Sequence, residues 1–138
     1  IKNPTFSFAA NLNSFPKHIG LDYAFAQSIF SHCGVDLILD WLNQISFHLK
    51  DTGALFATFL KSEVDFNGSG WIYPGCVRFL PSTMEALAAK AGFSFKVINW
   101  SHPRQSWAVF YKENFNASLI NNGDIHWNHV LKHLECGD

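Results

Sequence analysis

Hydrophobic and polar residues between positions 22 and 60 form first a short apolar run and then a pattern with the spacing of a helix. Asp22–Gln27 is a short apolar run with two aromatic residues and polar flanks, which is typical of a strand. Across Val35–Lys50 the apolar residues recur at the spacing of one helical face: Val35, Ile38, Trp41, Leu42, Ile45 and Leu49. The opposite side carries Asp36, Asp40, Gln44 and His48. These patterns predict a strand followed by an amphipathic helix.

A second buried strand is predicted at Ala54–Leu60, which is apolar and rich in strand-forming residues. Between helix and strand, Asp51-Thr52-Gly53 is expected to end the helix, with Gly53 in the left-handed conformation. Two strands joined by a helix of this length are parallel, with a right-handed crossover. Ligands bind such sheets at the carboxyl ends of the strands, so Ser28–Gly34 is the best-placed candidate site.

The flanking segments predict further elements. Thr5–Ala10 indicates a strand, Asn13–Gly20 a loop and Lys61–Gly70 a mobile loop that ends at Trp71–Gly75. A helix begins at Pro81, with Ser82 and Glu85 as a capping box, and stops at Gly92. Strands follow at Phe93–Trp100 and Ser106–Lys112, and their short link makes them antiparallel. Asn114–Gly123 is a linker and Asp124–Cys136 a terminal helix.

The segments LDYAFAQSIFSHC, LNQISFHLKDTGALFATF and MEALAAKAGFSFKVINW resemble class I S-adenosylmethionine-dependent methyltransferases over roughly residues 5–112. The resemblance implies an α/β fold with a Rossmann-like, mostly parallel sheet and a final antiparallel strand. Residues 1–113 would form the carboxyl-terminal portion of the domain, and residues 114–138 a linker and helix. The family's Gly-rich donor loop and ribose-binding acidic residue have no match here, so we expect the domain to be incomplete at its N-terminus.

Composition narrows the possible functions. The chain has 138 residues, of which 48% are hydrophobic and 15% charged, and its net charge is −1. This charge gives no basic field for nucleic acid, and no apolar run approaches the length of a membrane span. Three scattered cysteines favour a reducing, cytoplasmic location over a disulfide framework. The low charge content also suggests apolar surface that meets another copy of the chain or an N-terminal segment.

Candidate chemistry centres on His32, which could act as a general base. The resemblance implies that Ala26, Gln27, Ser28 and Ile29 contact the S-adenosylmethionine donor, that Asn11 meets its adenine ring, and that Phe30 and Ser31 face the acceptor. The alternative roles are helix caps for the two serines and a turn for Asn11. Trp71 and Tyr73 could wall the substrate site, and His102 with Arg104 could bind an anionic group or form a solvated hairpin tip.

Two other clusters are weaker candidates. His126, His129 and His133 share one face of the terminal helix, where Glu135 or Cys136 could complete a zinc site, but a polar helix face without metal is the expected state. Cys33 is expected to be a buried thiol and not a nucleophile.

The predicted function is methyl transfer from S-adenosylmethionine to a small-molecule acceptor. The alternative is a non-catalytic Rossmann-like interaction or scaffold module that completes its sheet with a partner chain. A different Rossmann-like enzyme would need a dinucleotide fingerprint, which this sequence lacks.

Overall fold

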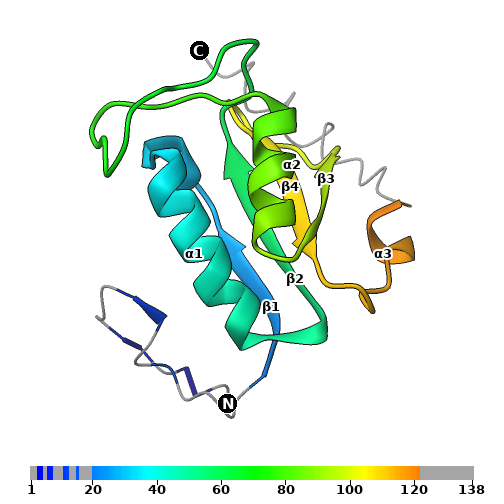
Figure 1. The fold of residues 1–138 in the computed structure, drawn as a ribbon. Coiled ribbons are helices and arrows are strands. Elements are labelled where there is room, and N and C mark those ends of the chain that lie inside the picture. The colour runs from blue at the N-terminus through cyan, green and yellow to red at the C-terminus, as the bar shows by residue number, and fades with distance from the viewer. Residues whose placement is uncertain (1–2, 5, 8–10, 13–14, 16–19, 122–138) are drawn as a thin grey trace, which may run out of the picture.

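Four strands form one mixed sheet in the order β1-β2-β4-β3 (Figure 1). The structure is a computed structural model that describes residues 3–4, 6–7, 11–12, 15 and 20–121. The strands are β1 (Leu21–Ala26), β2 (Leu49–Phe59), β3 (Ser94–Ile98) and β4 (Ser106–Tyr111). β1 is parallel to β2, whereas β4 is antiparallel to both of its neighbours. β1, β2 and β3 therefore point the same way and β4 points the other way, which confirms the predicted α/β fold.

The predicted strand–helix–strand unit is present, with α1 (Val35–His48) between β1 and β2. The helix ends differently from the prediction. Leu49, already extended, is its C-cap and donates its N–H to the carbonyl of Ile45, so no left-handed glycine is needed. Gly53 lies inside β2, where a Cβ would come within 2.9 Å of the Lys50 carbonyl oxygen and 3.1 Å of that of Asp22. Glycine is required there by the close approach of two backbones and not by a helix end.

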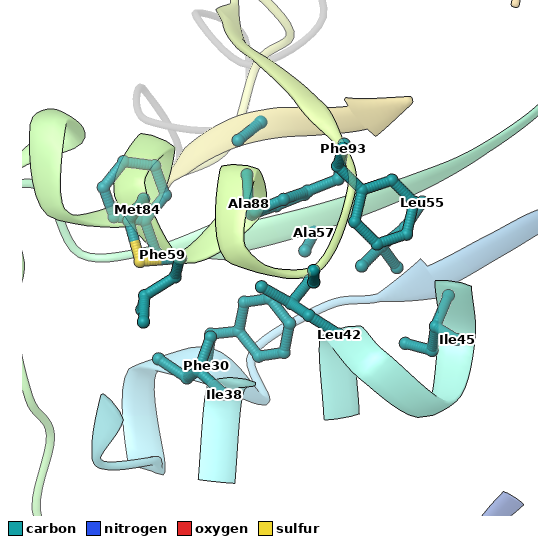
Figure 2. Packing of buried hydrophobic residues seen from close by; sticks show 14 of the residues in the cluster. Phe30, Ile38, Leu42, Ile45, Leu55, Ala57, Phe59, Met84, Ala88 and Phe93 are labelled. Carbon is teal, nitrogen blue, oxygen red and sulfur yellow. The ribbon is translucent and has the colours of Figure 1, made fainter. Parts of the chain in front are cut away.

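The main core lies on the face of the sheet covered by α1 and α2 (Pro81–Lys90). Figure 2 shows this core, in which Phe30 lies with Ile38 and Leu42 of α1. From the sheet, Leu55, Ala57 and Phe59 of β2 point to this face, in the alternation that a strand imposes. The residues packed here hold the loop between β1 and α1 in place.

His48 departs from the predicted polar side of α1, because its side chain is only 4% exposed. Its ring contacts those of Phe15 and Phe47. The ring nitrogen Nδ1 has no hydrogen-bond partner among the described residues. Phe15 thus packs against a position that helical spacing alone assigns to solvent.

The opposite face of the sheet carries a second cluster of aromatic residues. Phe56 of β2 stacks between Phe25 and Trp100, with ring centroids 5.2 Å and 5.0 Å away. Phe115 and Ile120, from the chain leading through α3 (Ser118–Asn121), pack on this cluster. Phe25 is nevertheless 65% exposed, and β1 pairs only with β2 among the described residues.

α2 begins without the predicted capping box. Its N-cap is Leu80, and no side chain at that position makes a cap hydrogen bond. Asp65 takes this role instead: its carboxylate accepts hydrogen bonds from the Leu80 N–H at 2.8 Å and the Thr83 hydroxyl at 2.6 Å. The cap comes from a loop 15 residues upstream, beyond the reach of a local motif. At the other end, Gly92 has φ 77° and terminates the helix as predicted.

Some predicted elements fall partly or wholly outside the described residues. Of the strand at Thr5–Ala10, the structure describes Phe6 and Ser7, and neither lies in a strand. The terminal helix at Asp124–Cys136 lies outside the described residues altogether. Among the residues that are described, no helix is long and apolar enough to cross a membrane.

Candidate functional site

Three loops meet at the edge of the sheet where β1 and β2 end. In the sheet register, Ala26 faces Ala57, Phe59 faces Ser106, and Ile98 faces Trp107. The segment after β1, the long segment after β2 and the hairpin between β3 and β4 therefore emerge at one edge. The predicted placement of Ser28–Gly34 at the carboxyl ends of parallel strands is confirmed.

Ser28 and Ser31 anchor this edge and do not cap α1, whose N-cap is Gly34 without a side-chain bond. Ser28 has φ 57°, in the left-handed region, and its N–H donates to the hydroxyl of Thr58 at 2.8 Å. The amide Nε2 of Gln105 lies 3.2 Å from the Ser28 hydroxyl and 3.4 Å from that of Ser31. Ser28 thus ties the loop to β2 and to the hairpin, and Ser31 ties it to the hairpin.

Residues 70–77 of the segment between β2 and α2 are hydrogen-bonded to the loop before α1 and to the first turn of α1. The mobility expected of Lys61–Gly70 stays a prediction. The N–H groups of Ile72 and Val77 each donate to a backbone carbonyl of that loop, those of His32 and Ser31, at 2.8 Å. The Gly70 N–H donates to the carboxylate of Asp36 at 2.9 Å. This network fixes the long segment as a wall beside His32.

His32 is held with one defined ring nitrogen facing the protein. Its Nδ1 lies 2.7 Å from the carbonyl oxygen of Gly75. A carbonyl oxygen only accepts hydrogen bonds, so the neutral ring carries its proton on Nδ1 and leaves a lone pair on Nε2. The rings of Trp71 and Tyr73 lie 5.6 Å and 5.4 Å from the imidazole, and both side chains are more than half exposed. Two predicted wall residues are thus brought to the predicted base.

Two predicted acceptor contacts are buried instead. Phe30 is 1% exposed and packs edge-on against Phe110, and Ser31 is fully buried. One turn of 3-10 helix, η2 (Phe30–His32), turns their side chains inward and leaves His32 at the surface. Neither side chain reaches a surface where an acceptor could touch it.

The predicted donor contacts are divided. Ala26 and Ile29 are partly buried against the main core, and Gln27 is exposed at the end of β1. Asn11 is not brought to this edge. Its neighbour Leu12 donates its N–H to Gln44, in the half of α1 that lies away from the Ser28–His32 loop.

His102 and Arg104 lie in the hairpin at the same edge but have separate roles. Nδ1 of His102 accepts the N–H groups of Gln105 at 3.0 Å and Arg104 at 3.3 Å, so this ring closes the turn. Burial and the positive charge of Arg104 lower the pKa of His102. The Arg104 side chain lines a cavity of about 370 Å³.

Residues absent from the sequence prediction form the rest of that cavity, namely Leu60, Lys61, Cys76, Arg78 and Gln105. The local pattern at 76–79 contains a usable signal, since buried Val77 and Phe79 alternate with exposed Cys76 and Arg78. No local pattern in the sequence predicts that this segment and the hairpin line the same cavity.

Cys33 is a buried thiol, as predicted. Its Sγ donates to the carbonyl of Ile29 at 3.3 Å, and burial, reinforced by the carboxylate of Asp36, raises its pKa to about 11. A thiol of this kind is a poor nucleophile at neutral pH. The described residues contain no group of three His, Cys, Asp or Glu side chains able to hold a metal ion, and His126, His129 and His133 lie outside them.

No family model matches this sequence, and no curated protein matches it. Solved structures do share its fold. TnmH aligns with a TM-score of 0.60 and 18% identity over 79% of this chain and 35% of its own. The mitomycin 7-O-methyltransferase MmcR aligns with a TM-score of 0.54 and 16% identity over 67% of this chain and 30% of its own. LepI in complex with S-adenosylmethionine aligns with a TM-score of 0.52 and 20% identity over 68% of this chain and 27% of its own.

The described chain has the fold of the carboxyl-terminal part of a class I methyltransferase domain. The sheet ends with α2, β3 and the antiparallel β4, which lies between β2 and β3, as the resemblance implied. The chain spans about a third of the length of the solved structures that it matches. At sequence identities this low, the structural similarity establishes only the fold. Any activity has to be argued from the site itself.

Proposed function

We propose that this chain takes part in S-adenosylmethionine-dependent methyl transfer to a hydroxyl or amine of a small molecule, with His32 as the general base. The observation that carries the proposal is the bond of Nδ1 to the Gly75 carbonyl. It fixes the tautomer that a base needs, at the edge of the sheet where ligands of this fold class bind. The methyltransferase fold of the solved neighbours supports the same reaction class.

The described residues supply one wall of a donor site. Gln27 is exposed at the end of β1, whereas the Ser28 N–H is already bonded to Thr58. The Gly-rich loop and the acidic residue with which the resembled family holds its donor have no match in this sequence. The described residues therefore fit only one edge of the S-adenosylmethionine molecule. The groups that would hold the rest of the donor are not among them. When bound, S-adenosylmethionine supplies a sulfonium methyl group.

The chemistry of this chain's own residues is proton removal. Nε2 of His32 accepts the proton of the acceptor as its oxygen or nitrogen becomes the nucleophile. The carbonyl of Gly75 keeps the ring oriented throughout, because it accepts a hydrogen bond from Nδ1–H in both protonation states. Trp71 and Tyr73 offer aromatic surface beside the imidazole, suited to a flat acceptor.

Isothermal titration of the protein with S-adenosylmethionine tests donor binding, and the absence of heat at millimolar donor would refute it. The base is tested separately with His32→Asn, because the Asn amide can still donate to Gly75 but cannot take a proton. We expect a loss of about 100-fold or more in methyl transfer, followed as S-adenosylhomocysteine formed with phenolic acceptors. His32→Asn with unchanged rates across pH would remove His32 from the mechanism.

The alternative function, a scaffold that completes its sheet with a partner, draws on exposed Phe25 and on the edge of β1 that has no strand partner among the described residues. Several solved neighbours, MmcR and CalO1 among them, are methyltransferases and another is a pericyclic reaction enzyme, which favours catalysis over a scaffold. Sedimentation distinguishes the two, because the scaffold function requires a stable complex and the catalytic function does not.

A further inference from the structure

Both arginines of the chain, Arg78 and Arg104, line the same cavity, together with Lys61. They come from three different places in the fold: Lys61 directly follows β2, Arg78 lies on the return toward α2, and Arg104 lies in the β3–β4 hairpin. Only ten Lys and Arg residues exist in the sequence, so three of them at one cavity is a concentration of charge in a charge-poor chain.

Among the described residues, these three cations have no acidic counterpart at the cavity. None of the described lining residues is an Asp or Glu. Of the two carboxylates on this segment, Asp65 accepts hydrogen bonds from the Leu80 N–H and the Thr83 hydroxyl at the start of α2, and Glu63 is exposed and does not line the cavity. The ion pair found among the described residues joins Lys50 to Asp22, at the start of β1. Like charges gathered without a counter-charge repel one another, and a bound anion would relieve that repulsion.

Backbone structure presents Arg78 to the cavity in a fixed way. Its neighbours Val77 and Phe79 are buried, and the Phe79 N–H donates to the Leu60 carbonyl at 3.0 Å. Alternation along this extended segment turns Arg78 outward. Arg104 is set by the turn that His102 closes. Two planar guanidinium groups on supported backbone are suited to a carboxylate or phosphate, to which each can donate two hydrogen bonds.

The cavity adjoins the proposed reaction centre through shared residues. Cys76 on its wall follows Gly75, which holds His32. Gln105, also on its wall, contacts the hydroxyl of Ser31, the residue before His32. We propose that this cavity binds a carboxylate or phosphate group of the acceptor and thereby places the rest of the acceptor at His32. The identification of the anion as part of an acceptor rests on the proposed methyl transfer, whereas the anion site itself does not.

The test is a nuclear magnetic resonance titration of the protein with phenyl phosphate and with benzoate, and with uncharged benzamide as the control. Because the chain has two arginines, its spectrum contains two arginine Nε–Hε signals, each assigned by the loss of one signal in Arg78→Gln or Arg104→Gln. We expect both signals to shift with an anion and not with benzamide. Tighter binding of phenyl phosphate would indicate a phosphorylated acceptor, and tighter binding of benzoate a carboxylated one.

Each Arg→Gln substitution is expected to weaken anion binding about tenfold or more, since hydrogen bonds to charged groups are the strong ones. Lys90→Gln, which removes an exposed charge from the last turn of α2, is the matched control and should leave binding unchanged. Failure of both arginine signals to move with either anion at millimolar concentration would overturn the proposal, as would unchanged binding in the double variant. Anion binding without methyl transfer would leave this site standing and contradict only the proposed function.

Discussion

The side-chain amide of Gln105 lies 3.2 Å from the hydroxyl of Ser28, and the two residues are 77 positions apart in the chain. This contact joins the β3–β4 hairpin to the loop after β1, which also carries His32. It is made to a serine with φ 57°, a conformation that L-residues other than Asn and Asp rarely adopt. The strained backbone at Ser28 is therefore held by side-chain bonds on both sides, from Gln105 and from Thr58.

Substitutions at Ser28 should separate the hydrogen bond from the backbone strain. Ser28→Ala loses the bond to Gln105 and keeps the strain, so we expect the free energy of unfolding to fall by about 1 kcal/mol. Ser28→Gly loses the same bond but relieves a left-handed backbone, a gain of about 1 kcal/mol, and should be close to the wild type. Urea denaturation measures both. An alanine variant as stable as the glycine variant would show that the conformation at Ser28 differs from the one described.

The start of α2 offers a direct comparison between a long-range cap and a local one. Asp65→Ala removes the acceptor for the Leu80 N–H and the Thr83 hydroxyl, and should lower the free energy of unfolding by about 1–2 kcal/mol. Glu85→Ala is the matched control, because the capping box expected from the sequence is not formed and Glu85 is exposed. Its effect in the same urea titration should stay within about 0.5 kcal/mol. Equal losses of stability in the two variants would indicate that the predicted capping box does form.

Thiol labelling should distinguish Cys33 from Cys76. Cys33 is buried and its pKa is raised to about 11, whereas Cys76 is exposed beside Arg78. The thiolate is the reactive form, so at a pH of about 8 iodoacetamide should modify Cys76 readily and Cys33 only after unfolding. Peptide mass spectrometry with and without urea measures the two rates. Labelling of native Cys33 at the rate of Cys76 would contradict the packing of the loop before α1.

Stability should fall in mildly acidic solution because of His102. Its folded pKa lies below the ordinary value of 6.5, so the unfolded chain binds a proton first as the pH falls. The contribution of His102 is therefore complete above a pH of about 6.5 and is lost as the pH drops through the folded pKa. His102→Asn keeps an acceptor for the two turn N–H groups but does not titrate. The wild type should lose more stability than this variant between neutral and acidic pH, as followed by urea midpoints; parallel losses would exclude His102 as the cause.

Local patterns in the sequence determined the elements that carry the core. The helical spacing of Ile38, Leu42 and Ile45 predicted a face that is indeed buried, and the short link between β3 and β4 predicted their antiparallel pairing. The same patterns placed His32 at the carboxyl edge of two parallel strands. These features follow from the spacing of apolar residues and from the lengths of the connecting segments, which are local properties of the sequence.

The tertiary structure alone decided which polar side chains meet. Asp65 caps a distant helix, η2 turns Phe30 inward where a ligand contact was expected, and His48 is buried where the helical period assigned it to solvent. The cavity shared by Lys61, Arg78 and Arg104 exists because three loops end at one edge of the sheet. Such meetings depend on loop paths and long-range hydrogen bonds between residues tens of positions apart, and periodicity carries no information about either.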